Sequence, residues 1–422
     1  MTIEVSRLAN GITVVSHRMP QLESVALGVW VGAGARSEAV HEHGVSHLLE
    51  HMAFKGTRRR SAREIAETIE AVGGEMNAET SVDHTAYYVR VLKEDALLGL
   101  DVLADILTGS VFDAEELTRE QHVIAQEIGA ALDTPEDIVF DYFQEAAYPG
   151  QAIGRSILGT PASVKALGPA DLTRFLATHY RGPGMVVSAA GAVDHDALVK
   201  AAERNLAAIP AASGPTEEPG TYRGGQWLKR RKLQEAQILL GFEAPSFRHP
   251  RYHAAMLLSS VLGGGMASRL FQEAREKRGL CYSIYSFHWP FTDTGILGIQ
   301  AATSEADIAA LVPVILRETA RIGDSVTQAE LDRAKAQMRA GLLMALESPL
   351  ARAGQMARHV LIYGRPLELA EIVAAIDKVT PADIGEAAEA MLRSPPTLAG
   401  IGPIRPLPGA AAIADQLARM GA

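Results

Sequence analysis

The chain has 422 residues, of which 47% are hydrophobic and 21% are charged, and its formal net charge is -10. This composition is ordinary for a soluble globular protein, and the length favours two domains over one compact core. The negative charge argues against a dedicated nucleic-acid-binding protein. The single cysteine, Cys281, excludes an internal disulfide framework and a thiolate zinc site, so a bound metal would need histidine and carboxylate ligands.

The N-terminal segment has neither the apolar run of a signal peptide nor the Arg- and Ser-rich composition of a transit peptide. No stretch of the chain approaches the roughly 20 apolar residues that a membrane-spanning helix needs. We therefore expect a cytoplasmic protein of bacterial type without a membrane span.

The N-terminal half alternates strand-like and helix-like patterns. In chain order we predict strands at 12–17 and 24–31, a buried helix at 43–56, an amphipathic helix at 61–74, one long strand at 77–92, helices at 93–110 and at 112–148 with a break near Thr134-Pro135, a helical segment at 161–180 and a strand at 185–193.

Residues 211–226 are polar, rich in Gly and Pro and without periodicity, which is typical of a linker. They divide the chain almost in half. We predict a catalytic domain at residues 1–212, a linker at 213–226 and a second, homologous domain at 227–422.

The two halves echo each other, which predicts an internal duplication. Residues 112–137 align with 326–351, and the strand-like segment at 24–34 corresponds loosely to 236–245. In this alignment the HLLEH segment of the first half falls near MLLSS at 256–260, which contains no metal-binding residue. The second half therefore reads as a copy without a metal site.

Two histidines and a glutamate lie within five residues, in the segment HGVSHLLEHMAFKGT. On a helix, His47 and His51 project in the same direction because residues four apart stack on adjacent turns. They could form half of a tetrahedral zinc site, and Glu50 would be placed to take a proton from water. His-x-x-Glu-His is the inverted zinc-peptidase motif. The alternative is a solvated helix face.

A catalytic zinc usually has three protein ligands, so a third ligand must come from elsewhere. The segment TREQHVIAQEIGA offers Glu120 and Glu127, which are seven residues apart and therefore share one helix face. The alternative is that both are ordinary exposed helix glutamates.

HGVSHLLEHMAFKGT followed by the helix with Glu120 and Glu127 resembles the pitrilysin-type family of inverted-motif zinc peptidases, in particular the mitochondrial processing peptidases and their bacterial relatives. The resemblance extends through NGITVVSH, GVWVGAGARSE, NAETSVDHTAYY and GRSILGT, and into SRLFQEAREKRGLCYSIYS of the second half. It implies one zinc ion per chain, held by His47, His51 and Glu127. It also implies that Glu50 is the general base and that Glu120 supports the site.

The same resemblance implies residues that contact the substrate. Asn77, Ala78, Glu79 and Thr80 match an edge strand beside the zinc, to which the substrate adds as a further strand. Arg275 and Tyr282 match a pair that binds the substrate backbone and stabilises the oxyanion, and Arg278 is the alternative to Arg275 if the register shifts.

Two carboxylates of the first half match positions that contact an arginine near the cleavage site. They are Asp137 and Asp141, with Glu136 as the alternative to Asp137; a solvated helix face is the competing interpretation. The three consecutive glycines at 263–265 match the position of a glycine-rich loop in the non-catalytic partner subunit, but the shorter loop carries no assigned role.

We expect an α+β fold with two homologous domains, each an antiparallel sheet packed against helices. The expected function is that of a zinc endopeptidase acting on peptides or unfolded presequence-like segments, with arginine preferred near the cut. Because this chain carries both the metal motif and the Arg/Tyr pair, we expect a homodimer that encloses a chamber. The alternatives are a non-catalytic scaffold like the core proteins of the cytochrome bc1 complex, and a peptide-binding protein that needs another chain.

Overall fold

The computed structural model describes residues 3–420. They form two compact units, and each unit takes segments from both halves of the sequence. The first unit comprises the described residues through Gly129, Arg155–Glu218 and Leu342–Leu367. The second comprises Ala130–Gly154, Pro219–Gly341 and the described residues from Glu368 onward.

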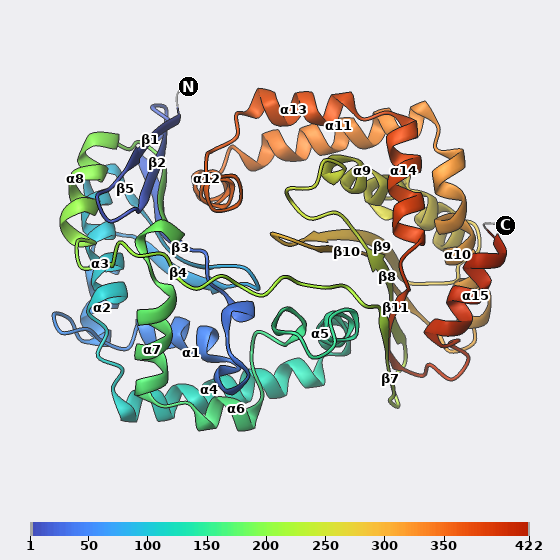
Figure 1. Cartoon of the computed structure of the whole chain (residues 1–422), viewed down its shortest axis with the longest axis horizontal. Helices are drawn as coiled ribbons and strands as arrows, with labels where there is room; N and C mark the ends of the chain where they lie inside the picture. The colour runs from blue at the N-terminus through green and yellow to red at the C-terminus, as the bar shows by residue number, and fades with distance from the viewer. Residues whose placement is uncertain (1–2, 421–422) are drawn as a thin grey trace. The chain divides into compact units, whose positions relative to one another are not determined.

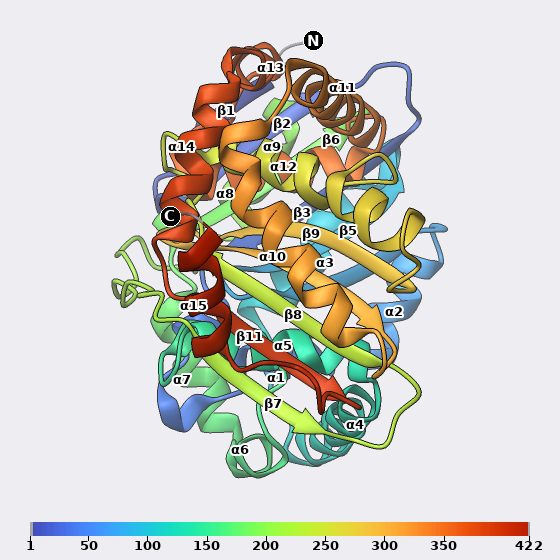
Figure 2. The ribbon, with the colours of Figure 1, turned by 90° about the vertical axis from the view of Figure 1, so that its right-hand side faces the viewer.

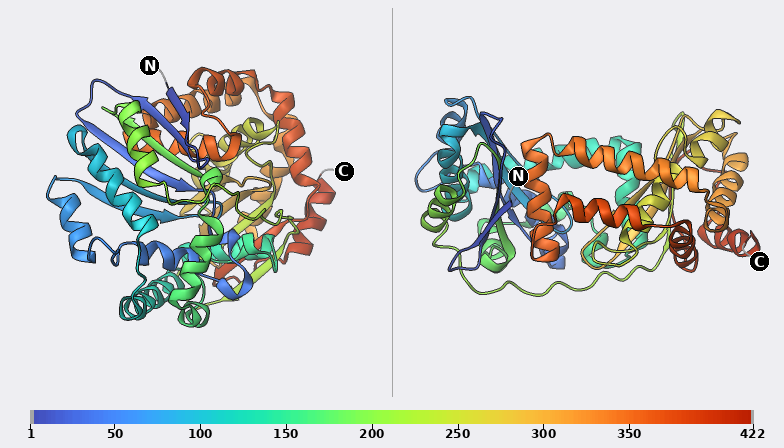
Figure 3. Two further views of the ribbon diagram at one scale, coloured as in Figure 1. Left: turned by 60° about the vertical axis from the view of Figure 1, so that its left-hand side comes forward. Right: turned by 90° about the horizontal axis from the view of Figure 1, so that it is seen from above.

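The first unit is built on a six-stranded sheet of order β1-β2-β6-β3-β5-β4. Its strands are β1 (Ile3–Arg7), β2 (Thr13–Arg18), β3 (Ser24–Val31), β4 (Glu75–Thr80), β5 (Thr85–Leu92) and β6 (Met185–Gly191). β2 and β6 run parallel, whereas the other neighbours are antiparallel. In Figure 3 the green strand β6 lies between blue strands from the start of the chain.

Both faces of this sheet are covered, which explains why every residue of β3 after Ser24 is buried. Trp30 faces α12 (Pro349–Tyr363) and packs with Met356 of that helix. On the opposite face, Val89 of β5 packs against Gly99 of α3 (Ala96–Thr108). Figure 1 shows α3 and α8 (His195–Asn205) on one side of the strands and α12 on the other.

The remaining helices of the first unit are α1 (Val45–Ala53), α2 (Ala62–Glu70), most of α4 (Ala114–Asp133), α6 (Pro161–Ala166) and α7 (Pro169–His179). Of these, α1 and α2 contact β4, and α7 contacts α1.

The second unit is built on a five-stranded sheet of order β7-β11-β8-β10-β9. Its strands are β7 (Gly225–Arg230), β8 (Ala236–Glu243), β9 (Ser283–Pro290), β10 (Gly295–Thr303) and β11 (Thr397–Gly402). β11 runs parallel to β7 and antiparallel to β8, and Figure 2 shows it in red between these two yellow-green strands.

The helices of the second unit also lie on both faces of its sheet (Figure 1). On one face they enclose a large apolar core with β8 and β10, and on the other face α5 packs against β7, β8 and β11. The helices are α5 (Pro135–Ala147), α9 (Tyr252–Gly263), α10 (Ile308–Ser325), most of α11 (Gln328–Ala345), α13 (Leu369–Lys378), α14 (Pro381–Leu392) and α15 (Ala410–Met420).

The two units share one topology, which confirms the duplication expected from the sequence. Without β1, the strand order of the first sheet matches that of the second, and the parallel pair falls at the same place. α4 and α11 begin at Ala114 and Gln328, and α5 and α12 begin at Pro135 and Pro349, which is the same offset in both cases. The units also exchange equivalent helices: α5 packs on the second sheet and α12 on the first.

The α+β class with two homologous sheet-and-helix domains is confirmed. The sheets, expected to be antiparallel, are mixed, because β2 pairs with β6 and β7 with β11 in parallel. The structure also adds one helix on the further face of each sheet. Residues 213–224 form no helix or strand, and β7 begins at Gly225. The division of the chain at 213–226 stays a prediction, because the compact units draw on both sides of it.

Two predicted elements are wrong in detail. The single strand at 77–92 is two strands, β4 and β5, because Ser81 and His84 close a tight turn through their backbone and side chains. The helical segment at 161–180 is two helices, since Pro169 starts α7 after α6 has ended. β1 was not predicted from the sequence. Within residues 3–420, no helix is both long and apolar enough to cross a membrane.

Candidate active site

Helix α1 carries the inverted motif, and its sequence fixes which side faces the core. Gly44 precedes the helix with φ of 92°, a left-handed conformation that glycine adopts without strain. Leu48, Leu49 and Met52 are fully buried, and the helix contacts α7 and β4. The polar residues of the motif therefore share the remaining face of the helix.

The start of α1 is held by the carboxylate of Glu38. This carboxylate accepts hydrogen bonds from the backbone N–H groups of Gly44 at 2.8 Å and Ser46 at 2.9 Å, and also from the Ser46 hydroxyl. Such donors are unpaired at a helix N-terminus unless a side chain accepts from them. Burial raises the pKa of Glu38 to about 7, although its hydrogen bonds and the nearby Arg155 guanidinium act in the opposite direction.

His47, His51 and Glu127 converge on one point of the first unit. Oε2 of Glu127 lies 3.8 Å from Nε2 of His47 and 3.6 Å from Nε2 of His51. The three side chains each offer a ligand atom, and these atoms lie within 4.8 Å of one another. A tetrahedral zinc ion with normal bond lengths separates its ligand atoms by about 3.4 Å, so this donor set fits zinc with small adjustments.

His47 is in the state that a metal ligand requires. Burial lowers the pKa of His47 to about 4, and the neighbouring His51 ring lowers it further. The imidazole is therefore neutral at neutral pH, which leaves a lone pair for a metal ion. The side chains of His47 and His51 are only 12% and 17% exposed, so the alternative of a solvated helix face is wrong.

Glu120 sits behind His51, on the side away from Glu127. Its Oε2 accepts a 2.9 Å hydrogen bond from Nδ1 of His51, and its Oε1 lies 2.6 Å from Nζ of Lys55. Burial alone would raise the pKa of Glu120, but the bonds to Lys55 and His51 outweigh it and the pKa lies below its ordinary value. Glu120 is 6% exposed, so it is not a solvated helix glutamate.

Lys55 was not singled out in the sequence. The sequence does contain an indication of its role: Lys55 follows His51 by four residues, and a buried carboxylate near the motif would need a cation as its partner. The resemblance placed Glu120 near the metal site, but it did not predict the ion pair between Glu120 and Lys55.

Glu50 points towards the edge strand β4. Its Oε2 accepts a 2.5 Å hydrogen bond from the hydroxyl of Thr80. Burial raises the pKa of Glu50, and the Thr80 hydrogen bond opposes that shift. A partly buried carboxylate with a raised pKa has the properties of a general base.

β4 forms one edge of the first sheet, and among the described strands it pairs with β5 alone. Asn77 and Glu79 are exposed, whereas Ala78 is buried. The outer backbone groups of an edge strand can pair with an added peptide. The role of residues 77–80 in substrate binding stays a prediction.

The predicted Arg/Tyr pair belongs to the second unit. Arg275 lies on a short π-helical turn, Phe271–Glu276, with its guanidinium 4.6 Å from the centre of the Phe271 ring. Tyr282 is 74% exposed. The alternative residue, Arg278, is held by an ion pair with Glu273 at 2.7 Å. Which of the two arginines contacts a substrate, and the role of Tyr282, stay predictions.

Asp137 and Asp141 also belong to the second unit, on α5. Asp137 is exposed, as is its alternative Glu136, and Asp141 is half-buried. The negative charge of Asp137 contributes to the raised pKa of Tyr285 on β9, after the larger effect of burial. Their predicted role in binding arginine stays a prediction.

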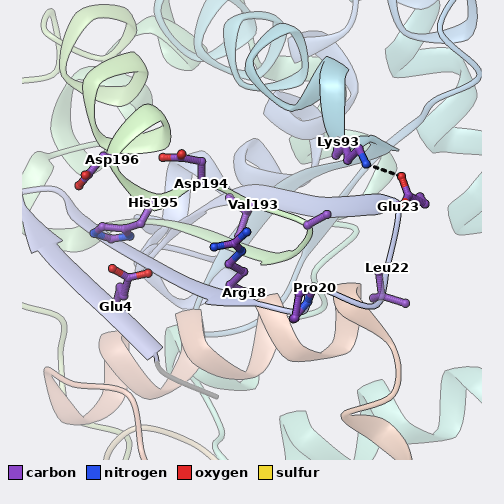
Figure 4. Close-up of a pocket in the computed structure, with 11 residues that line it drawn as sticks. Glu4, Arg18, Pro20, Leu22, Glu23, Lys93, Val193, Asp194, His195 and Asp196 are labelled. Carbon is purple, nitrogen blue, oxygen red and sulfur yellow. Dashed lines mark ion pairs between the residues drawn. The ribbon is translucent and has the colours of Figure 1, made fainter.

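The first unit also has a surface cavity of about 400 Å³ that contains none of the predicted residues. Figure 4 shows Glu23 and Lys93 at one end, Glu4 and His195 at the other, and Arg18 between them. Lys93 pairs with Glu23 at 2.5 Å, and the ring of His195 lies between two serine hydroxyls. Lys93, Glu23 and His195 are therefore already paired.

Comparison with known proteins identifies the family. The profile described as "Insulinase (Peptidase family M16)" matches residues 13–161, and that of the "Peptidase M16 inactive domain" matches residues 166–338. An "Uncharacterized zinc protease" of Rickettsia bellii is 36% identical over 400 residues, which are 94% of this chain and 97% of that protein. The names of such relatives support a peptidase-type function.

Solved structures show the same fold. A chain of Complex III2 from Candida albicans matches with a TM-score of 0.88 and 23% identity, covering 99% of this chain and all of that one. A protease from Helicobacter pylori matches with a TM-score of 0.86 and 22% identity over 95% of this chain and 99% of that one. Together with the profiles and the Rickettsia relative, these findings confirm the resemblance seen in the sequence: the chain belongs to peptidase family M16.

Proposed function

We propose that this protein is a zinc-dependent endopeptidase that hydrolyses peptides or unfolded, presequence-like segments, with one zinc ion per chain. The observation that carries the proposal is the convergence of His47, His51 and Glu127 on one point of the first unit. The zinc-protease names of the relatives support the same conclusion.

Nε2 of His47, Nε2 of His51 and a carboxylate oxygen of Glu127 would hold the ion. A zinc ion held there supplies Lewis acidity towards the scissile carbonyl and the attacking water. Glu120 accepts the Nδ1–H of His51, which fixes the tautomer that leaves Nε2 available to the metal.

Glu50 takes the proton from the attacking water at its carboxylate and later passes it to the leaving amine. The hydrogen bond from Thr80 fixes the direction of that carboxylate. Burial of Glu50 supports this role, since a carboxylate with a raised pKa holds a transferred proton more readily.

The substrate would be bound in an extended conformation along β4, at Asn77, Ala78, Glu79 and Thr80, with backbone hydrogen bonds providing most of the affinity. Arg275 and Tyr282 would donate to the substrate backbone and to the developing oxyanion. Asp137 and Asp141 lie four residues apart on α5, so they could share the guanidinium of a substrate arginine.

We further propose a homodimer that encloses a chamber, with each active site completed by the Arg/Tyr pair of the second molecule. Light scattering during size-exclusion chromatography tests this arrangement. An active species of about 45 kDa would contradict it, because the chain alone has a mass of 45.0 kDa.

The second candidate function is that of a non-catalytic scaffold subunit, and the likeness to a chain of Complex III2 favours it. Zinc content of the purified protein separates the two candidates, together with cleavage of a quenched basic peptide in the presence and absence of a chelator. The peptidase is supported by chelator-sensitive cleavage that Glu50→Gln abolishes. Mass spectrometry of peptides cut by the wild type but not by Glu50→Gln then defines the cleavage rule.

A further inference from the structure

We propose that Lys55 is a positioning residue for the metal centre: it holds the carboxylate of Glu120, which in turn fixes the ring of His51. This inference rests on the proposed zinc peptidase function. It adds a residue that lies outside the His-x-x-Glu-His motif and does not itself offer a metal ligand.

The contacts form one continuous chain from Lys55 to the metal-facing edge of His51. Nζ of Lys55 donates to Oε1 of Glu120 at 2.6 Å, and Oε2 of the same carboxylate accepts from Nδ1 of His51 at 2.9 Å. Each oxygen of Glu120 therefore has its own partner, which fixes the plane of the carboxylate and, with it, the plane of the imidazole. Nε2 of His51 then faces Glu127, 3.6 Å away.

The position of Lys55 is itself determined by the end of α1. The helix ends at Ala53, and the backbone N–H of Lys55 donates to the carbonyl of Met52 at 3.2 Å. The ammonium reaches back from this anchored loop to α4, where Glu120 is 6% exposed. Lys55 thus ties the helix with the two histidines to the helix with the third ligand.

Charge explains why a cation is needed at this position. Glu120 and Glu127 place two carboxylates on opposite edges of the His51 ring. Without a cation on its far side, the buried Glu120 carboxylate would be left with the imidazole as its only strong donor. It would then gain by turning towards solvent, and His51 would lose its fixed orientation.

His47 provides an internal comparison. Its Nδ1 is buried and has no hydrogen-bond partner within residues 3–420. Of the two histidines, only His51 is therefore oriented by a hydrogen bond at Nδ1. A substitution of Lys55 should disturb this one ligand and leave the other two in place.

The test is the zinc affinity of the full-length protein, measured by competition with a chromophoric chelator. Lys55→Met is expected to weaken zinc binding about tenfold, the lower end of the effect of outer-shell partners. Lys55→Arg keeps the charge and should restore most of the affinity. The matched control is Lys165→Met, which removes an exposed lysine of α6 and should leave the affinity unchanged.

A double-mutant comparison distinguishes positioning from a general effect of charge. If Lys55 acts through Glu120, the substitution Lys55→Met should cause no further loss of zinc affinity in a Glu120→Gln background. Thermal unfolding of the zinc-free proteins checks that the variants fold. If Lys55→Met does not fold, the polar variant Lys55→Gln replaces it in the same comparison.

Two results would overturn this inference without affecting the proposed function. In the first, the wild type binds zinc and the affinity of Lys55→Met lies within twofold of it. In the second, Lys55→Met lowers the zinc affinity of the Glu120→Gln variant as much as it lowers that of the wild type. A wild-type protein that binds no zinc would instead overturn the proposed function, and this inference with it.

Discussion

The hydroxyl of Thr80, on the edge strand β4, donates a 2.5 Å hydrogen bond to Oε2 of Glu50, on helix α1. The family resemblance predicted that Thr80 belongs to a substrate-binding strand and that Glu50 is the general base. The structure joins the two residues directly, so the strand that would receive the peptide also fixes the carboxylate that would receive the proton.

This relationship predicts that Thr80→Val lowers kcat more than it raises KM. Hydrogen bonds to charged groups contribute about 1.5–3 kcal/mol, which corresponds to a loss of roughly 10- to 100-fold in kcat. Thr80→Ser keeps the hydroxyl and should retain most of the activity. Steady-state kinetics on a quenched peptide provide the measurement, and a change confined to KM would show that Thr80 serves substrate binding alone.

Glu50→Gln should abolish cleavage and leave zinc binding intact. Glutamine cannot accept the proton, and general base catalysis contributes about 10²- to 10⁴-fold in rate. Its amide still accepts a hydrogen bond from Thr80, so the fold of α1 should persist. Activity is measured together with metal content by atomic emission; undiminished cleavage by a zinc-loaded Glu50→Gln variant would remove Glu50 from the mechanism.

Glu127→Ala should lose zinc and activity together, because one of three protein ligands disappears. Treatment of the wild type with a chelator should give the same loss, and addition of zinc should reverse it for the wild type only. An exposed glutamate of the same helix, Glu115, supplies the control variant Glu115→Ala, whose zinc content should equal that of the wild type. Full zinc content in Glu127→Ala would exclude this residue as a ligand.

The buried Glu38 predicts a pH dependence of stability. Burial raises its pKa from 4.5 to about 7, so the folded protein binds this proton more tightly than the unfolded chain does. The stabilising effect of protonation is fully present below pH 4.5 and is lost as the pH rises to about 7. The whole effect amounts to roughly 3 kcal/mol in the free energy of unfolding.

Urea unfolding between pH 5 and pH 8 measures this contribution. The free energy of unfolding of the wild type should fall with rising pH more steeply than that of Glu38→Gln, which has no titratable group at this position. The groups that face Glu38 are the N–H groups of Gly44 and Ser46, the Ser46 hydroxyl and the Arg155 guanidinium. Parallel curves for the two proteins would mean that these donors keep Glu38 ionised throughout the range.

The packing of α5 on the second sheet predicts that substitutions on its buried face destabilise the second unit. Phe143 is fully buried, and its ring packs against Gly241 of β8. Phe143→Ala should lower the free energy of unfolding by about 3–5 kcal/mol. Glu145→Ala, at an exposed position of the same helix, should change it by less than about 0.5 kcal/mol. Chemical denaturation of both variants tests whether α5 is an integral part of this core.

Several elements of the fold could be predicted because their patterns are local. β3 extends over the predicted residues 24–31. The break between α4 and α5 lies at Thr134-Pro135, as predicted, because a proline fits best in the first turn of a helix and Pro135 begins α5. The strand predicted at 77–92 was wrong because Ser81 to His84 contain no glycine or proline, so their turn depends on hydrogen bonds that the sequence pattern does not reveal.

The sequence by itself determined the chemistry that this protein can support. The spacing of His47, Glu50 and His51 places them on one helical face whatever surrounds that helix, and a single cysteine restricts the donors to histidine and carboxylate. The family resemblance had already implied Glu127 as the third ligand. Only the tertiary structure decided that Lys55 and Thr80 hold Glu120 and Glu50, and that α5 packs on the second sheet and α12 on the first. The reason is physical: helical periodicity is a local property of the chain, whereas ion pairs and packing between distant segments depend on how the whole chain is folded.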